Sequence, residues 1–116
     1  MRIAISGTHS AGKTTLMTEL ALQLGEYETI DEPYHELLDE GCVFSDPPSV
    51  DDFLVQLERS LAVLAARRGS NVLFDRCPAD FLAYLLALEA RESVQEWSAA
   101  ATDALAALDL IVFVPI

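Results

Sequence analysis

The chain has 116 residues, of which 52% are hydrophobic, and 19 acidic against 7 basic residues give it a formal net charge of −12. This length is enough for one domain with its own hydrophobic core, and so apolar a composition argues against intrinsic disorder. Nucleic acids and anionic membranes are held mainly by clustered lysine and arginine, so we expect neither as a partner.

Other broad features point to a soluble protein of a reducing compartment. The longest apolar runs, residues 81–88 and 108–116, are far shorter than the roughly 20 residues that a membrane-spanning helix needs. The N-terminal residues lack both the apolar core and the small-residue cleavage site of a secretion signal. Cys42 and Cys77 are isolated thiols rather than a disulfide framework. We therefore expect a cytoplasmic protein, and its oligomeric state stays open.

The first half of the chain predicts two strands and three helices. In chain order these are a buried strand over residues 2–6, a helix over 13–24, a weakly marked strand over 28–31, a short helix over 34–40 and a long helix over 49–68. Gly25 and Gly41 stand where glycine commonly follows a helix. Ser49 followed by Asp52 is a helix-start signature.

The second half predicts two more strands and two more helices, namely a strand over 71–74, a helix over 78–88, a helix over about 93–107 and a strand over 110–114. Pro78 suits the first position of its helix. Continuous apolar strands that alternate with helices are typical of a parallel sheet covered on both faces. We therefore expect a three-layer α/β fold, with residues 1–116 as one domain. Such sheets bind ligands at the carboxyl ends of their strands.

A phosphate-binding signature follows the first predicted strand. The Walker A pattern G-x-x-x-x-G-K-T is matched without departures between a strand and a helix. Its glycines let backbone N–H groups point at an anion, and the helix adds its positive end. Lys13 is expected to contact the β- and γ-phosphates and Thr14 to bind Mg²⁺, which predicts ATP and Mg²⁺ as cofactors. The predicted nucleotide contacts are Gly7, Thr8, His9, Ser10, Ala11, Gly12, Lys13, Thr14 and Thr15.

An acid stands at the end of the third predicted strand. Residues 72–74 are apolar, and Asp75 follows at the ligand edge, where its carboxylate is expected to hold Mg²⁺ together with Thr14. The alternative for Asp75 is an ordinary turn or helix-capping role before Pro78. Arg76 has a planar fork that suits a phosphate or a carboxylate, and its alternative is an ion pair with a surface acid.

Two carboxylates follow the second predicted strand. An attacking hydroxyl profits from an adjacent carboxylate base, which makes Glu32 the candidate base and Asp31 the second choice. A solvated turn is the alternative for both residues. Tyr34 and Gln56 are candidate substrate contacts beside Asp31, with ordinary packing as their alternative. His35 is interpreted as a surface residue rather than a ligand.

With these residues in hand, the chain resembles the P-loop nucleoside and nucleotide kinases, in particular the small bacterial AAA-domain ATPase/kinase group that is similar to ribosylnicotinamide kinases. The matching pieces are residues 7–15, 31–33, 72–76 and 80–84. Deoxynucleoside kinases have a Glu-Pro pair whose glutamate acts as base on the sugar hydroxyl, and Glu32 matches it. They also have an acid–arginine pair, matched by Asp75 and Arg76, and a base-recognising glutamine, to which Gln56 is similar.

The resemblance implies a P-loop NTPase sandwich that is incomplete at its C-terminus. Kinases of this type continue past the fourth strand into an arginine-bearing lid, an adenine-contacting loop and a fifth strand. Residues 1–116 stop at the predicted fourth strand, so the lid and the last strand are expected to be lacking.

The leading hypothesis is an ATP-dependent phosphotransferase that acts on a hydroxyl or phosphate of a nucleoside-like small molecule. Its partners would then be a nucleotide and a small-molecule acceptor, with Lys13, Glu32 and Arg76 as catalytic residues. One alternative is a nucleotide-binding ATPase or regulatory switch without such an acceptor. Another is a fragment that binds nucleotide without turnover.

Overall fold

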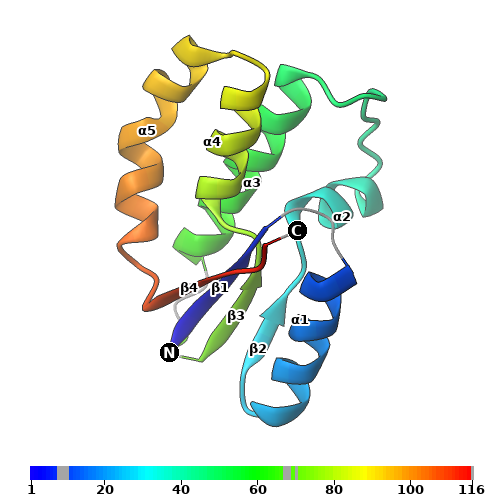
Figure 1. Ribbon diagram of the computed structural model, residues 1–116, viewed down its shortest axis with the longest axis vertical. Helices are drawn as coiled ribbons and strands as arrows, with labels where there is room; N and C mark the ends of the chain where they lie inside the picture. The colour runs from blue at the N-terminus through cyan, green and yellow to red at the C-terminus, as the bar shows by residue number, and fades with distance from the viewer. Residues whose placement is uncertain (8–10, 67–68, 70, 116) are drawn as a thin grey trace.

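A parallel sheet of four strands is the centre of the computed structural model, which describes residues 1–7, 11–66, 69 and 71–115 (Figure 1). The strand order across the sheet is β2-β3-β1-β4. The elements in chain order are β1 (Arg2–Ser6), α1 (Ala11–Gln23), β2 (Glu28–Ile30), α2 (Pro33–Asp39), α3 (Val50–Ala66), β3 (Val72–Asp75), α4 (Pro78–Ala87), α5 (Arg91–Leu105) and β4 (Leu110–Phe113).

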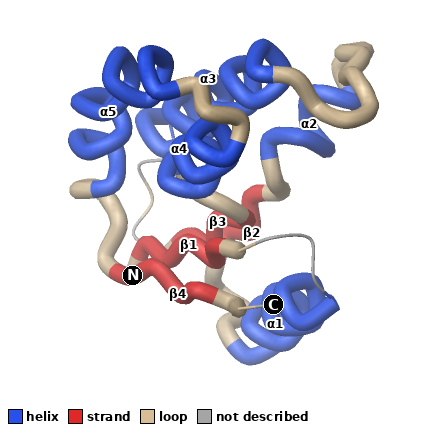
Figure 2. Tube along the Cα trace, turned by 45° about the horizontal axis from the view of Figure 1, so that its top comes forward, coloured by secondary structure: helices blue, strands red, loops and turns tan. Residues whose placement is uncertain are grey.

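The helices cover the two faces of the sheet unequally. Figure 2 shows α1 alone on one face and α3, α4 and α5 together on the other, while α2 lies beyond the carboxyl end of β2. From β1 the chain passes over β3 to reach β2, at one edge of the sheet. From β3 it passes over β1 in the opposite direction to reach β4, at the other edge. This reversal makes the carboxyl ends of β1 and β3 the switch point, where sheets of this class bind ligands. The predicted three-layer α/β fold with a parallel sheet is confirmed.

Side chains of the central strands alternate between two core layers. Ile3 and Ile5 of β1 pack with Leu73 of β3 against α1. Ala4 and Phe74 belong to the layer on the opposite face. This period of two is what a pleated strand imposes, and burial on both faces explains why these strands read as continuous apolar runs.

Helix ends follow the predicted signals with one exception. The Ser49 and Asp52 side chains each accept a hydrogen bond from the other residue's backbone N–H, at 3.2 and 2.8 Å, which is the reciprocal cap predicted for α3. Gly41 has a φ of +94° after α2, as a helix-ending glycine should. Gly25 follows α1 without a positive φ, so that helix does not end on a left-handed glycine.

Arg2 ties the amino end of the sheet to two helices. Its guanidinium donates hydrogen bonds of 2.9 Å to the carbonyl oxygens of Leu64 and of Ala107, near the C-terminal ends of α3 and α5. It also lies over the Phe74 ring, 5.3 Å from the centroid. A cavity of about 500 Å³ opens beside this contact, at the end of the sheet opposite to the switch point. Within the described residues, no helix combines the length and apolarity that crossing a membrane requires.

Candidate functional site

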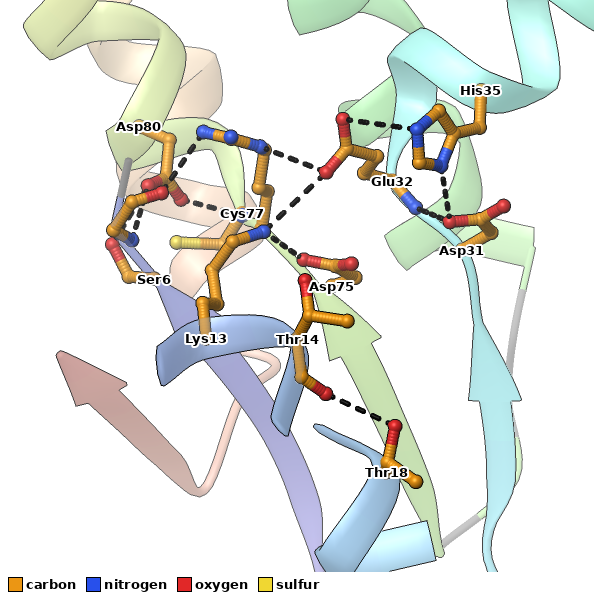
Figure 3. A network of polar contacts seen from close by, with 12 residues as sticks. Ser6, Lys13, Thr14, Thr18, Asp31, Glu32, His35, Asp75, Cys77 and Asp80 are labelled. Atoms are coloured by element: carbon orange, nitrogen blue, oxygen red, sulfur yellow. Dashed lines mark hydrogen bonds and ion pairs between the residues drawn. The ribbon is translucent and has the colours of Figure 1, made fainter. Parts of the chain in front are cut away.

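Four charged side chains meet at the switch point between β1 and β3. Lys13 comes from the first turn of α1, Glu32 precedes α2, Asp75 ends β3, and Arg76 follows it. Figure 3 shows Lys13 between the carboxylates of Glu32 and Asp75. The sequence-predicted catalytic and metal-binding residues of three separate segments are thus brought together at one edge of the sheet.

The Lys13 ammonium is almost completely buried, with 3% of the side chain exposed. Its Nζ lies 3.4 Å from Glu32 Oε2 and donates a short hydrogen bond to Asp75 Oδ1. Burial raises the pKa of Asp75, and the hydrogen bond and charge of Lys13 oppose that shift. A buried charge costs several kcal/mol unless it is paired, so these three side chains depend on one another.

Arg76 connects Glu32 to the start of the phosphate loop. Its Nε donates to Glu32 Oε2 at 3.3 Å, and its Nη1 donates to the Gly7 carbonyl at 2.9 Å and, over a short distance, to the Tyr84 hydroxyl. Its Nη2 is buried, and within the described part of the chain it has no hydrogen-bond partner. The backbone of Arg76 has a φ of +72°, a conformation that costs a non-glycine residue about 1–3 kcal/mol and is concentrated at functional sites.

Gly7, the first glycine of the loop, is held from several directions. Asp80 Oδ1 accepts hydrogen bonds of 2.9 Å from the Gly7 N–H and from the Ser6 hydroxyl. Asp80 Oδ2 accepts one of 2.9 Å from the Cys77 N–H and so caps α4. Gly7 itself has a φ of +138°, and an added Cβ would lie 2.6 Å from the carbonyl oxygen of Val114. No side chain fits there.

Asp80 and Tyr84 were not predicted as site residues. An acid three residues after a helix N-cap is a capping signal, and it predicts the hydrogen bond from the Cys77 N–H to Asp80. It does not predict the second hydrogen bond of Asp80, from the Gly7 N–H. Tyr84 packs against Phe53 with ring centroids 5.0 Å apart, and the Arg76 guanidinium lies 5.4 Å from the Tyr84 centroid. Both contacts depend on the packing of α3 and α4, which local patterns do not report.

The rest of the predicted phosphate loop is described only in part. Thr8, His9 and Ser10 lie outside the described residues, and Ala11, Gly12, Lys13, Thr14 and Thr15 form the first turns of α1. The positive end of α1 therefore faces the switch point. A cavity of about 470 Å³ is lined by Thr14, Asp31 and Asp75 together with residues of α1 and β2. The two predicted metal ligands, Thr14 and Asp75, thus share one cavity.

The predicted substrate contacts lie in different surroundings. Asp31 is half-exposed and accepts a hydrogen bond from the Glu32 N–H at 2.8 Å. The Tyr34 ring packs on Phe44 with centroids 5.1 Å apart. Gln56 is buried, and its Nε2 donates to the Asp52 carbonyl of its own helix at 3.2 Å. This hydrogen bond of Gln56 is thus made within α3 and not to the charged cluster.

A family model described as an AAA domain matches residues 2–116. The chain belongs to the AAA domain family. No curated protein and no solved structure matches it. As an AAA domain it is a nucleotide-binding P-loop protein, of a type that hydrolyses ATP or transfers its phosphoryl group. This agrees with the Walker A interpretation, whereas the narrower kinase resemblance stays a hypothesis.

The described residues of this AAA domain fit a nucleotide bound with Mg²⁺. The Thr14 hydroxyl and the Asp75 carboxylate are the hard oxygen ligands that Mg²⁺ prefers. Lys13 and the start of α1 supply positive charge at the same edge. The buried Nη2 of Arg76 is a donor that still needs an acceptor, which an anionic or hydroxyl group would provide.

Proposed function

We propose that the chain is an ATP-dependent phosphotransferase that moves the γ-phosphoryl group to a hydroxyl of a nucleoside-like small molecule. The observation that carries this proposal is the state of Glu32. Its side chain is 3% exposed, and its Oε2 is held by Lys13 and Arg76. Its Oε1 is buried and has no hydrogen-bond partner among the described residues. A carboxylate oxygen fixed in place but unsatisfied suits a general base.

The other charged residues fit roles around that base. Lys13 would neutralise charge on the transferred group, and Arg76 Nη2 would donate to the acceptor oxygen whose proton Glu32 takes. Mg²⁺, held by Thr14 and Asp75, would neutralise the triphosphate charge. Phosphoryl transfer depends on positioning and electrostatics, both of which a buried cluster of fixed charges supplies.

The charge of the cluster favours a hydroxyl acceptor over a phosphate. The carboxylates of Glu32, Asp31 and Asp75 would repel a second phosphate group. The two cations beside them, Lys13 and Arg76, are already paired with Glu32. A neutral hydroxyl needs one acceptor and one donor, and Glu32 Oε1 is an acceptor and Arg76 Nη2 a donor that have no hydrogen-bond partner among the described residues.

The test is ADP release measured with and without a panel of nucleosides, for the wild type and for Glu32→Gln. We expect acceptor-stimulated turnover in the wild type and a fall of about 10²–10⁴-fold in the variant, the usual contribution of a general base. ATP affinity should change much less. Glu58→Gln, which removes an exposed carboxylate of α3, is the matched control and should behave as the wild type.

The outcomes separate the alternatives. Turnover that no acceptor stimulates would show an ATPase or switch, and ATP binding without any ADP would show a binding-only chain. An equal loss of turnover and ATP binding in Glu32→Gln would remove Glu32 as the base.

A further inference from the structure

A buried base must pass on the proton that it takes, and Glu32 has a neighbour placed for this. The Nε2 atom of His35 lies 3.9 Å from Glu32 Oε1, the oxygen without a hydrogen-bond partner (Figure 3). The Glu32 side chain is 3% exposed, whereas the His35 side chain is 52% exposed. The imidazole therefore spans the distance between the interior of the cluster and solvent.

Asp31 sets the orientation and the tautomer of this imidazole. The His35 Nδ1 lies 3.1 Å from Asp31 Oδ1, a hydrogen bond in which the carboxylate can only accept. In the neutral ring the proton therefore sits on Nδ1, and the lone pair of Nε2 faces Glu32 Oε1. A nitrogen fixed in this way is ready to receive a proton from the glutamic acid, directly on closer approach or across one water.

We propose that His35 relays the acceptor's proton from Glu32 to solvent, an inference that rests on the proposed function. The acceptor O–H bond breaks as its oxygen bonds to the γ-phosphorus, the bond from that phosphorus to ADP breaks, and the proton moves to Glu32 Oε1. The proton then moves from Oε1 to His35 Nε2 and from the exposed ring to water. Glu32 returns to the carboxylate, so the sum is phosphorylated acceptor, ADP and one proton.

The charges around His35 set the pH at which this relay works. Burial favours the neutral ring, but the hydrogen bond to Asp31 and the negative charges of Glu32, Asp31 and Asp75 outweigh it and raise the pKa of His35 above 6.5. The positive charges of Lys13 and Arg76 are both paired with Glu32, the carboxylate that His35 approaches. Because only the neutral ring accepts a proton, relay-dependent turnover should rise with pH through the pKa of His35.

The first experiment measures the coupling without any turnover. The imidazole signals of the wild type, Glu32→Gln and Asp31→Asn are followed by NMR against pH, and His35→Asn assigns which of the two histidines is which. Each charge-removing variant should shift the pKa of His35 downward. A pKa that Glu32→Gln leaves unchanged would overturn the relay, since the two groups would then not interact.

The second experiment measures acceptor-stimulated ADP release against pH for the wild type and His35→Asn. The asparagine keeps a donor toward Asp31 but has no titratable nitrogen. We expect turnover to fall by about tenfold, which is less than the roughly 10²–10⁴-fold contribution of the base itself because His35 acts after Glu32, and we expect the limb that follows the pKa of His35 to disappear. Added imidazole should restore part of the rate.

The outcomes distinguish a failure of the His35 relay from a failure of the proposed phosphotransferase function. Unchanged turnover and an unchanged pH profile in His35→Asn would overturn the relay alone. A lower rate that imidazole does not restore would show that His35 only orients Asp31 and Glu32. A wild type without acceptor stimulation would overturn the proposed function and the relay together.

Discussion

Asp80 accepts a hydrogen bond of 2.9 Å from the backbone N–H of Gly7 and so joins the start of α4 to the start of the phosphate loop. The same carboxylate receives the Ser6 hydroxyl and the Cys77 N–H. The Gly7 carbonyl is held in turn by Arg76. Both backbone polar groups of Gly7 are therefore fixed by residues that follow β3.

Replacing Asp80 with alanine should weaken both the fold and nucleotide binding. The Gly7 and Cys77 N–H groups would be left buried without acceptors, at a cost of about 1–3 kcal/mol each in the free energy of unfolding. Affinity for a fluorescent ATP analogue should fall as well, because the loop start would lose its anchor. Denaturant unfolding and ligand titration measure the two effects. Ser6→Ala removes one donor and leaves both N–H groups paired, so equal losses in the two variants would contradict this role.

Gly7→Ala should be strongly destabilising, because the new Cβ would lie 2.6 Å from the Val114 carbonyl oxygen at a φ of +138°. We expect a loss of at least about 2 kcal/mol in the free energy of unfolding, in line with the cost of such backbone conformations and an added clash. Gly25→Ala is the matched control, since nothing lies within 4 Å of its added Cβ. A Gly7→Ala protein as stable as Gly25→Ala would show that the loop start is not constrained as described.

Arg76→Lys should lower turnover more than it lowers ATP affinity. A lysine keeps the charge but loses the fork that holds Glu32, Gly7 and Tyr84 at once. We expect a fall of about tenfold or more in turnover, equivalent to about 1.4 kcal/mol or more in the activation free energy. Arg59→Lys, which alters a surface pair with Glu40, should change little. Steady-state kinetics on both variants would contradict the prediction if they gave the same rates.

The pH dependence of stability should carry a contribution from His35. Its pKa is raised in the folded protein, so the protonated form stabilises the fold. That stabilisation is complete below about pH 6.5, the unfolded value, and is lost as the pH rises through the folded pKa. Unfolding free energies of the wild type and His35→Asn should therefore differ most at acidic pH and converge as the pH rises above the folded pKa of His35. A difference that grows with pH would reverse the sign and contradict the assignment.

The strands and most helix ends were predictable because local chemistry determines them. Residues 72–74 are apolar before Asp75, and Pro78 occupies the first turn of its helix as expected. The helix predicted over 13–24 begins earlier, at Ala11, because the last residues of the Walker A pattern already belong to the first helical turn. The helix predicted over 93–107 begins at Arg91, where exposed residues carry no apolar signal.

The candidate site was predictable only where a motif marks it. Lys13, Glu32 and Asp75 were placed at one edge because parallel strands bring their carboxyl ends together. The double use of Asp80 and the contact of Tyr84 with Arg76 arise from how α4 packs, and no short pattern encodes that. Gln56 was suggested by a resemblance, and its Nε2 donates to a carbonyl of its own helix, so its role as a substrate contact stays a prediction.

The contacts of Arg2 join segments that are made at very different times during synthesis. Its partner carbonyls belong to Leu64 and Ala107, and the latter lies 105 positions further along the chain. The Ala107 carbonyl is therefore available to Arg2 only after α5 has been made, and the pairing of β1 with β4 comes later still. Contacts that join such distant segments carry a higher loop-closure entropy cost and form more slowly than local contacts do.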